Sequence, residues 1–205
     1  MPEQNPARVG PPRGAVIGAV FGALICASFG RLWLSLAARD LSGWRATLDI
    51  VGWVVLGVFV VAGVLVARNV LRSPSSQWGG KQRPRQGWGA WLAIVIAVEV
   101  ALILGGQTLL SGTLGHPEWI PVWALLVVGA HFWPFALVLR MDAFHILAVA
   151  LCAVAVVSAF VASLAGIASL WLILPGLGGA AALWGFCGWT LYRMARGRPL
   201  AWRNN

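Results

Sequence analysis

Residues 127–139 read VVGAHFWPFALVL and place a histidine and a proline inside an apolar run that is long enough to cross a bilayer. An ionisable ring at membrane depth costs free energy unless it faces a partner or a watery cavity. His131 is therefore a candidate functional residue, and we expect its partner to lie on another apolar run.

Glu99 is the partner that the sequence offers, since it lies in the middle of the preceding apolar run, residues 90–110. Each side chain lies about nine residues from the cytoplasmic end of its run, and at about 1.5 Å per residue both lie roughly 13 Å deep in an antiparallel hairpin. We therefore predict that Glu99 and His131 face each other or share one water molecule.

The composition indicates a membrane protein, because 60% of the residues are hydrophobic, 10% are charged and the mean hydropathy is +0.81. Runs of about 20 apolar residues are typical of membrane-spanning segments. The runs are residues 14–37, 46–67, 90–110, 119–139, 144–165 and 169–192. Backbone groups in hydrocarbon must be hydrogen-bonded internally, which favours helices. The predicted fold is all-α, a polytopic bundle of six transmembrane helices over residues 14–192.

The basic residues predict the topology. All Lys and Arg except Arg31, Arg39 and Arg45 fall before the first run, in the second and fourth connections, or after the last run. The positive-inside rule then places both termini in the cytoplasm, as in a bacterial inner-membrane protein.

Three further segments are expected on the cytoplasmic side. Residues 1–13 form a disordered tail, residues 68–86 a basic linker and residues 193–205 a basic tail. The net charge of +9 lies beside helix ends, so anionic lipid is the expected partner, rather than nucleic acid.

Small residues on the first run predict a helix-packing face. Gly14, Gly18 and Gly22 recur at four-residue spacing, which permits close approach of another helix. A homo-oligomer or a membrane partner subunit is a further hypothesis for such a bundle.

Charged side chains near the outer ends of the runs predict a second polar cluster. Arg31 and Asp49 are expected at similar depth, and His116 and Glu118 lie in the third connection. The alternative for Arg31 is that its long side chain reaches the outer headgroups alone.

Prolines interrupt two of the runs. Pro134 lacks an N–H and frees a carbonyl one turn back, beside His131, so a kink there would open a polar niche. Pro175 predicts a break near the outer end of the last run. Trp133 and Gln107 are the remaining candidates for the site around Glu99 and His131.

The segment VGAHFWPFA, residues 128–136, resembles a VGxHFxPLA signature found in small bacterial integral membrane proteins. Phe135 departs from the usual leucine, and the resemblance covers one run of six. It implies a membrane protein with several helices and implies no activity.

No motif of a known catalytic centre is present in the sequence. It lacks GxGxxG, a Walker loop, GxSxG and HExxH, and its three histidines fall at three different depths, which predicts no metal site. Three hypotheses remain: a transporter or sensor with a proton or ligand site at Glu99 and His131, a structural accessory subunit, and, least favoured, an enzyme that uses the pair as acid and base. No cofactor is indicated.

Overall fold

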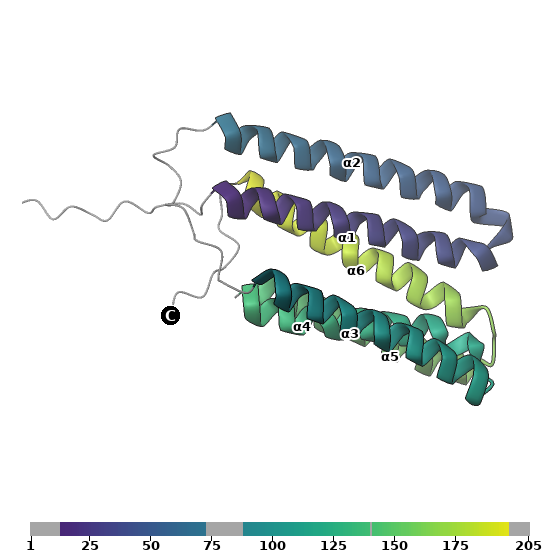
Figure 1. Cartoon of the computed structure of the whole chain (residues 1–205). Helices are drawn as coiled ribbons and strands as arrows, with labels where there is room; N and C mark the ends of the chain where they lie inside the picture. Colours follow the sequence, from purple (N-terminus) through teal and green to yellow (C-terminus); the bar gives the residue numbers. More distant parts are fainter. Residues whose placement is uncertain (1–12, 73–87, 140, 197–205) are drawn as a thin grey trace, which may run out of the picture.

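The computed structural model describes residues 13–72, 88–139 and 141–196, and those residues form long helices with short connections and no strand (Figure 1). Six helices are long and apolar enough to span a membrane, which confirms the predicted fold class. The elements are α1 (Arg13–Asp40), η1 (Ser42–Trp44), α2 (Arg45–Arg72), α3 (Trp88–Thr108), η3 (Leu109–Thr113), η4 (Pro117–Trp119), α4 (Ile120–Leu139), α5 (Asp142–Ala165) and α6 (Leu170–Ala195).

The helices extend further into the predicted linker and tail than the hydropathy indicated. α2 continues to Arg72, so residues 68–72 of the predicted linker are helical, and α6 continues to Ala195. α3 passes into a short π-helix, η3, before the third connection. The remainder of the linker and most of both tails lie outside the described residues.

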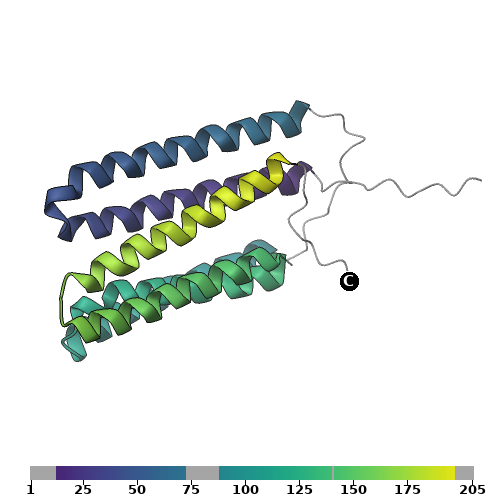
Figure 2. The same cartoon turned by 180° about the vertical axis from the view of Figure 1, so that it is seen from behind.

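The chain runs up and down, so the start of α1 and the end of α6 lie at one end of the bundle, here called the inner end (Figures 1 and 2). α6 packs along α1, and α2 covers another side of α1. On its opposite side α6 meets α5 and α4, and α3 packs mainly against α4. The last helix therefore joins the first two helices to the other three, whereas α3 lies at the periphery.

Glycines allow α1 and α6 to approach closely. A Cβ added at Gly176 would lie 2.7 Å from Cβ of Ala37 and 2.9 Å from the carbonyl oxygen of Trp33. The indole of Trp184 covers Gly30, and its N–H donates to the carbonyl of Ala27 over 3.1 Å. Close backbone approach of this kind supplies the packing energy that holds helices together in lipid.

No other helix of the described chain packs against Gly14, Gly18 and Gly22, so close packing at these glycines stays a prediction. A Cβ at any of the three would meet no atom within 4 Å. Four-residue spacing identifies a smooth helix face but not its direction, and here α1 turns a different face, which includes Gly30, toward α6.

The segment around Pro175 is helical, because α6 runs from Leu170 to Ala195 with Pro175 inside it; a kink at this proline stays a prediction. Pro175 and Gly176 are buried in the contact with α1, so this segment serves helix packing. Pro134 likewise lies within α4, which continues past it.

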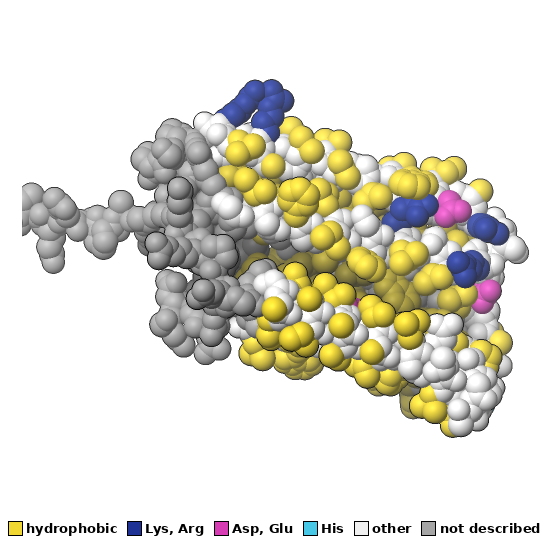
Figure 3. Space-filling model, in the orientation of Figure 1, with side chains coloured by type: hydrophobic (Ala, Val, Ile, Leu, Met, Phe, Trp, Pro, Cys, Tyr) yellow, Lys and Arg dark blue, Asp and Glu magenta, His cyan; other side chains and the backbone are white. Residues whose placement is uncertain are grey.

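Charged side chains on the visible face gather toward the two ends of the bundle, and an apolar band lies between them (Figure 3). Large apolar side chains that face outward on α2, α3 and α5 include Val58, Ile94 and Phe160, exposed by 61%, 62% and 64%. Such exposure suits contact with lipid tails and agrees with a multi-pass membrane protein.

Candidate functional site

The contact between α3 and α4 positions the pair that the sequence predicted. Nδ1 of His131 lies 3.2 Å from Oε1 of Glu99, and each side chain is 16% exposed. The helices are antiparallel, and the two residues face each other within the spanning segments. The geometric part of the prediction is therefore confirmed.

The pair is at ion-pair distance but is not aligned as a hydrogen bond. Nδ1 of His131 is buried and has no hydrogen-bond partner, although the carboxylate is close. Within the described part of the chain, Glu99 accepts no hydrogen bond. Its oxygens are also not among the fully buried side-chain atoms that lack a hydrogen-bond partner. The carboxylate thus retains capacity for a proton or another positively charged group.

Two contacts on either side of the pair hold α3 against α4. Toward the inner end, the rings of Trp91 and Phe135 meet edge to face with centroids 6.1 Å apart. Toward the outer end, the indole N–H of Trp123 donates to the carbonyl of Leu102 over 2.9 Å, and the same indole covers Gly106. Glu99 and His131 therefore occupy the middle of a narrow helix contact.

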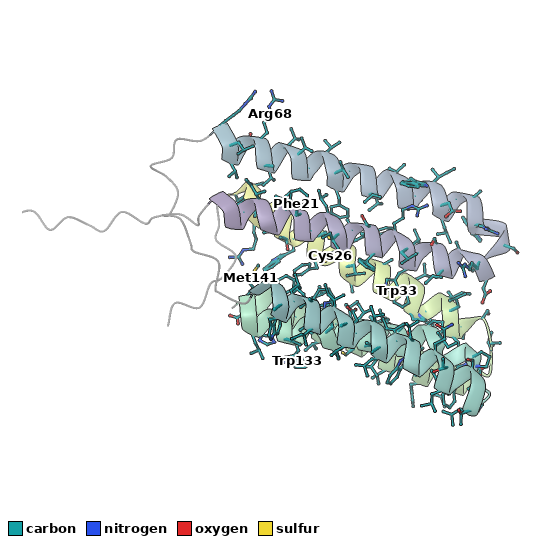
Figure 4. The ribbon with its side chains drawn as sticks, in the orientation of Figure 1. Phe21, Cys26, Trp33, Arg68, Trp133 and Met141 are labelled. Carbon is teal, nitrogen blue, oxygen red and sulfur yellow. The ribbon has the colours of Figure 1, made fainter. Side chains whose placement is uncertain are left out.

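Trp133 and Gln107 do not belong to this site. Trp133 is 45% exposed and lies at the edge of the bundle away from α1 (Figure 4). Its ring lies near that of His145 of α5, with centroids 6.2 Å apart. Gln107 is exposed, and its carbonyl accepts a hydrogen bond from Ser111. Trp133 was included for its depth and Gln107 as a polar residue of the same run as Glu99, and neither reason specifies the direction of a side chain.

The predicted outer cluster consists of two separate arrangements. Nδ1 of His116 lies 2.8 Å from Oε1 of Glu118, and the His116 ring stacks on Trp119 with centroids 4.4 Å apart. Trp119 in turn stacks against Trp171 at the start of α6, at 5.9 Å. This exposed stack of three rings links the third connection to α6.

Arg31 is not paired with Asp49 within the described chain, which corrects the part of that prediction that concerned these two residues. Its guanidinium lies over the ring of Trp53 of α2, 3.8 Å from the centroid. The Arg31 stem also contacts α2 at Gly52, where an added Cβ would lie 3.2 Å from Cγ. A cation over an aromatic face is attracted by the ring quadrupole, so Arg31 helps to join α1 and α2.

An aromatic cluster beside His131 was missed by the sequence reading. Phe132 stacks on Phe144 of α5 with centroids 5.8 Å apart, and Phe144 meets Phe186 of α6 at 5.3 Å. Phe135 lies edge to face on His131 at 4.8 Å. Three helices each place phenylalanine near their inner ends, and that common depth was the signal that would have indicated a cluster.

No group of three histidine, cysteine or acidic side chains converges among the residues that the structure describes. Cys187 instead donates its thiol to the carbonyl of Ala23, 2.9 Å away, within the α1–α6 contact. Comparisons with protein-family models, curated proteins and solved structures give no match. The geometry of the site is consequently the only guide to function.

Proposed function

We propose that this chain is a bacterial inner-membrane protein in which Glu99 and His131 form a proton-linked site of a transporter or sensor. The observation that supports this most is a carboxylate and an imidazole 3.2 Å apart inside the spanning segments, without an aligned hydrogen bond. Binding of one proton converts a carboxylate beside a neutral imidazole, which has a net negative charge, into a pair with no net charge. Without that proton the pair carries one uncompensated negative charge at membrane depth, so proton binding changes the attraction between α3 and α4.

The position of the pair gives the proton a structural effect. α3 packs mainly against α4, and the pair is in the middle of that contact. A change in attraction at this point alters how firmly α3 is held, while the α1–α6 contact is unaffected. α3 is therefore the helix that responds in the proposed mechanism.

A structural accessory subunit is the second candidate, because the pair lies between two other contacts that hold α3 against α4 and could simply add to them. A buried pair stabilises a structure only if its geometry is good and its remaining lone pairs are bonded. The misaligned contact of Glu99 fits this role less well. Catalysis by the pair remains the third and weakest hypothesis.

The two main candidates differ in the effect of Glu99→Gln, which keeps the shape and removes the titratable group. For the proton site, infrared difference spectra between about pH 5 and pH 8, where histidine usually titrates, should contain a carboxyl band that this variant loses. The variant should melt close to the parent. Glu118→Gln at the exposed outer pair is the matched control and should retain the band. A large loss of thermal stability with unchanged spectra would instead favour the structural role.

Two partners remain part of the proposal. The basic residues near the inner end, among them Arg68 and Arg72 of α2, are expected to contact anionic lipid on the cytoplasmic side. A homo-oligomer or a membrane partner subunit is compatible with the large exposed apolar faces of the bundle.

A further inference from the structure

The Glu99 carboxylate lies beside a positive charge only when His131 is protonated. Among the residues that the structure describes, His131 is the titratable side chain that contacts it, and α4, which carries His131, is the helix against which α3 mainly packs. When the imidazole is neutral, the ionised carboxylate is an uncompensated charge at membrane depth. Such a charge must take up a proton or be paired with a cation.

Aromatic rings surround the imidazole that contacts this carboxylate. His131 contacts Phe132 and Phe135, with ring centroids 4.6 Å and 4.8 Å away, and Phe144 lies 6.4 Å from Phe135. Faces of aromatic rings attract organic cations, and they bind bulky apolar substituents as well. A carboxylate whose partner imidazole lies among phenylalanine rings has the chemistry that recognises a positively charged, lipophilic molecule.

The site is reachable from the side of the bundle. Glu99 and His131 each keep 16% of the side chain exposed, and Phe135, Phe144 and Phe186 are only partly buried. The molecular surface is hollowed between α1 and α3 (Figure 3), where α3 lacks the close packing that it has with α4. A ligand dissolved in the membrane would not need to cross the well-packed contact between α1 and α6.

Charge and donor type restrict the class of ligand. An anion would have to approach the carboxylate, and its attraction to a protonated His131 would be offset by Glu99. A divalent metal would find only two ligands among the described residues. A neutral polar molecule would gain few hydrogen bonds in a wall of phenylalanine. A lipophilic cation satisfies both the charge and the rings.

We propose that Glu99 and the adjoining cluster of Phe132, Phe135, Phe144 and Phe186 bind a lipophilic organic cation, which exchanges with a proton on Glu99. This proposal rests on the proton-linked site proposed above and names its ligand class. One proton leaves the carboxyl group for each monovalent cation that binds, so charge is conserved at the site. Low pH therefore weakens binding.

The test uses tetraphenylphosphonium as the probe and the full-length protein in detergent, with binding measured by equilibrium dialysis. Affinity should rise about tenfold per pH unit while the carboxyl group is mostly protonated, because one proton competes with one cation. Glu99→Gln should abolish saturable binding, and Glu118→Gln should not. Phe135→Leu should weaken binding by about two- to thirtyfold, the range of one cation–π contact. The control Phe160→Leu removes an exposed ring on α5 and should have no effect.

Tetraphenylborate, an anion of the same shape, separates recognition from simple partitioning. Equal uptake of both ions, retained in Glu99→Gln, would overturn the proposed cation site. A carboxyl band that titrates and is lost in Glu99→Gln, together with no saturable binding of the phosphonium, would also reject the cation site but leave the proton-linked function intact. Loss of both signals in the parent protein would reject both proposals. Folding of each variant is checked by its melting temperature, and a misfolded Phe135→Leu is replaced by Phe135→Tyr, which keeps the ring and should bind.

Discussion

Gly176→Ala is expected to destabilise the bundle, because the added methyl group has no room between α6 and α1. The new Cβ would lie 2.7 Å from Cβ of Ala37, 2.9 Å from the carbonyl oxygen of Trp33 and 3.0 Å from the Ala37 nitrogen. Ordinary contact begins at 3.4 Å, so these atoms must withdraw by 0.7 Å, 0.5 Å and 0.4 Å respectively. Two of the three neighbours are backbone atoms, which a change of rotamer cannot move.

The expected loss follows from that displacement. Inserting a methyl group into a well-packed core typically costs about 1–3 kcal/mol. For a domain of this size each kcal/mol lowers the melting temperature by about 2–4 °C, which gives a drop of several degrees. In lipid the loss has little compensation, since helix association depends on packing rather than on the hydrophobic effect.

The assay is thermal unfolding of purified protein in one detergent, followed by tryptophan fluorescence. Gly185→Ala is the matched control on the same helix, because a Cβ there meets nothing within 4 Å. It should melt at or slightly above the parent temperature, since alanine favours helix over glycine by up to about 1 kcal/mol. Equal melting of Gly176→Ala and Gly185→Ala would show that the described α1–α6 contact does not hold the bundle together.

Three other predictions concern α1, α3 and the topology. Gly18→Leu should melt like the parent, since its face is open within the chain; a marked drop would indicate that this face packs on a second copy or a partner. Trp123→Phe removes the indole donor to Leu102, so the free energy that holds α3 in place should fall by the roughly 0.6 kcal/mol typical of an interhelical hydrogen bond in a membrane. The amide hydrogens of α3 should then exchange faster, and unchanged exchange would count against the contact. Reporter fusions after Ser76 and Arg203 should both report the cytoplasm, and a periplasmic signal from either would refute the orientation.

The sequence predicted the helices well, because the length of an apolar run is set by the thickness of the bilayer and by the need to satisfy every backbone group. It predicted the common depth of Glu99 and His131 for a similar reason, and the cost of an ionisable side chain without a partner in lipid then predicted that they meet. Two consecutive helices joined by a short connection are antiparallel neighbours, so their depth can be counted from their ends. Neither inference requires any knowledge of the helix order around the bundle.

The sequence says less about the direction of a helix face. Gly18 and Gly22 have the spacing of a packing motif, yet Gly176 and Gly30 make the close contacts, because the long-range pairing of α1 with α6 decides which face is covered. Arg31 was assigned to Asp49 on depth alone, and the ring of Trp53 lies below its guanidinium instead. The hydropathy pattern indicates how deep a residue lies in the membrane. It gives little information on the rotation of a helix about its axis, particularly where the helix is apolar on all sides.

The peripheral place of α3 explains how one bundle can combine a rigid part with a responsive site. An acid and a base placed between α1 and α6 would be sealed by close backbone contacts, as the thiol of Cys187 is, and exchange of a proton would require the core to open. Glu99 and His131 instead lie between helices joined by a few contacts along one side, where both side chains keep some exposure. Because α3 borders mainly α4, a shift of α3 costs the contacts at Trp91, at Trp123 and within the pair itself. Substitutions at the pair should therefore alter the response of α3 before they alter the stability of the whole bundle.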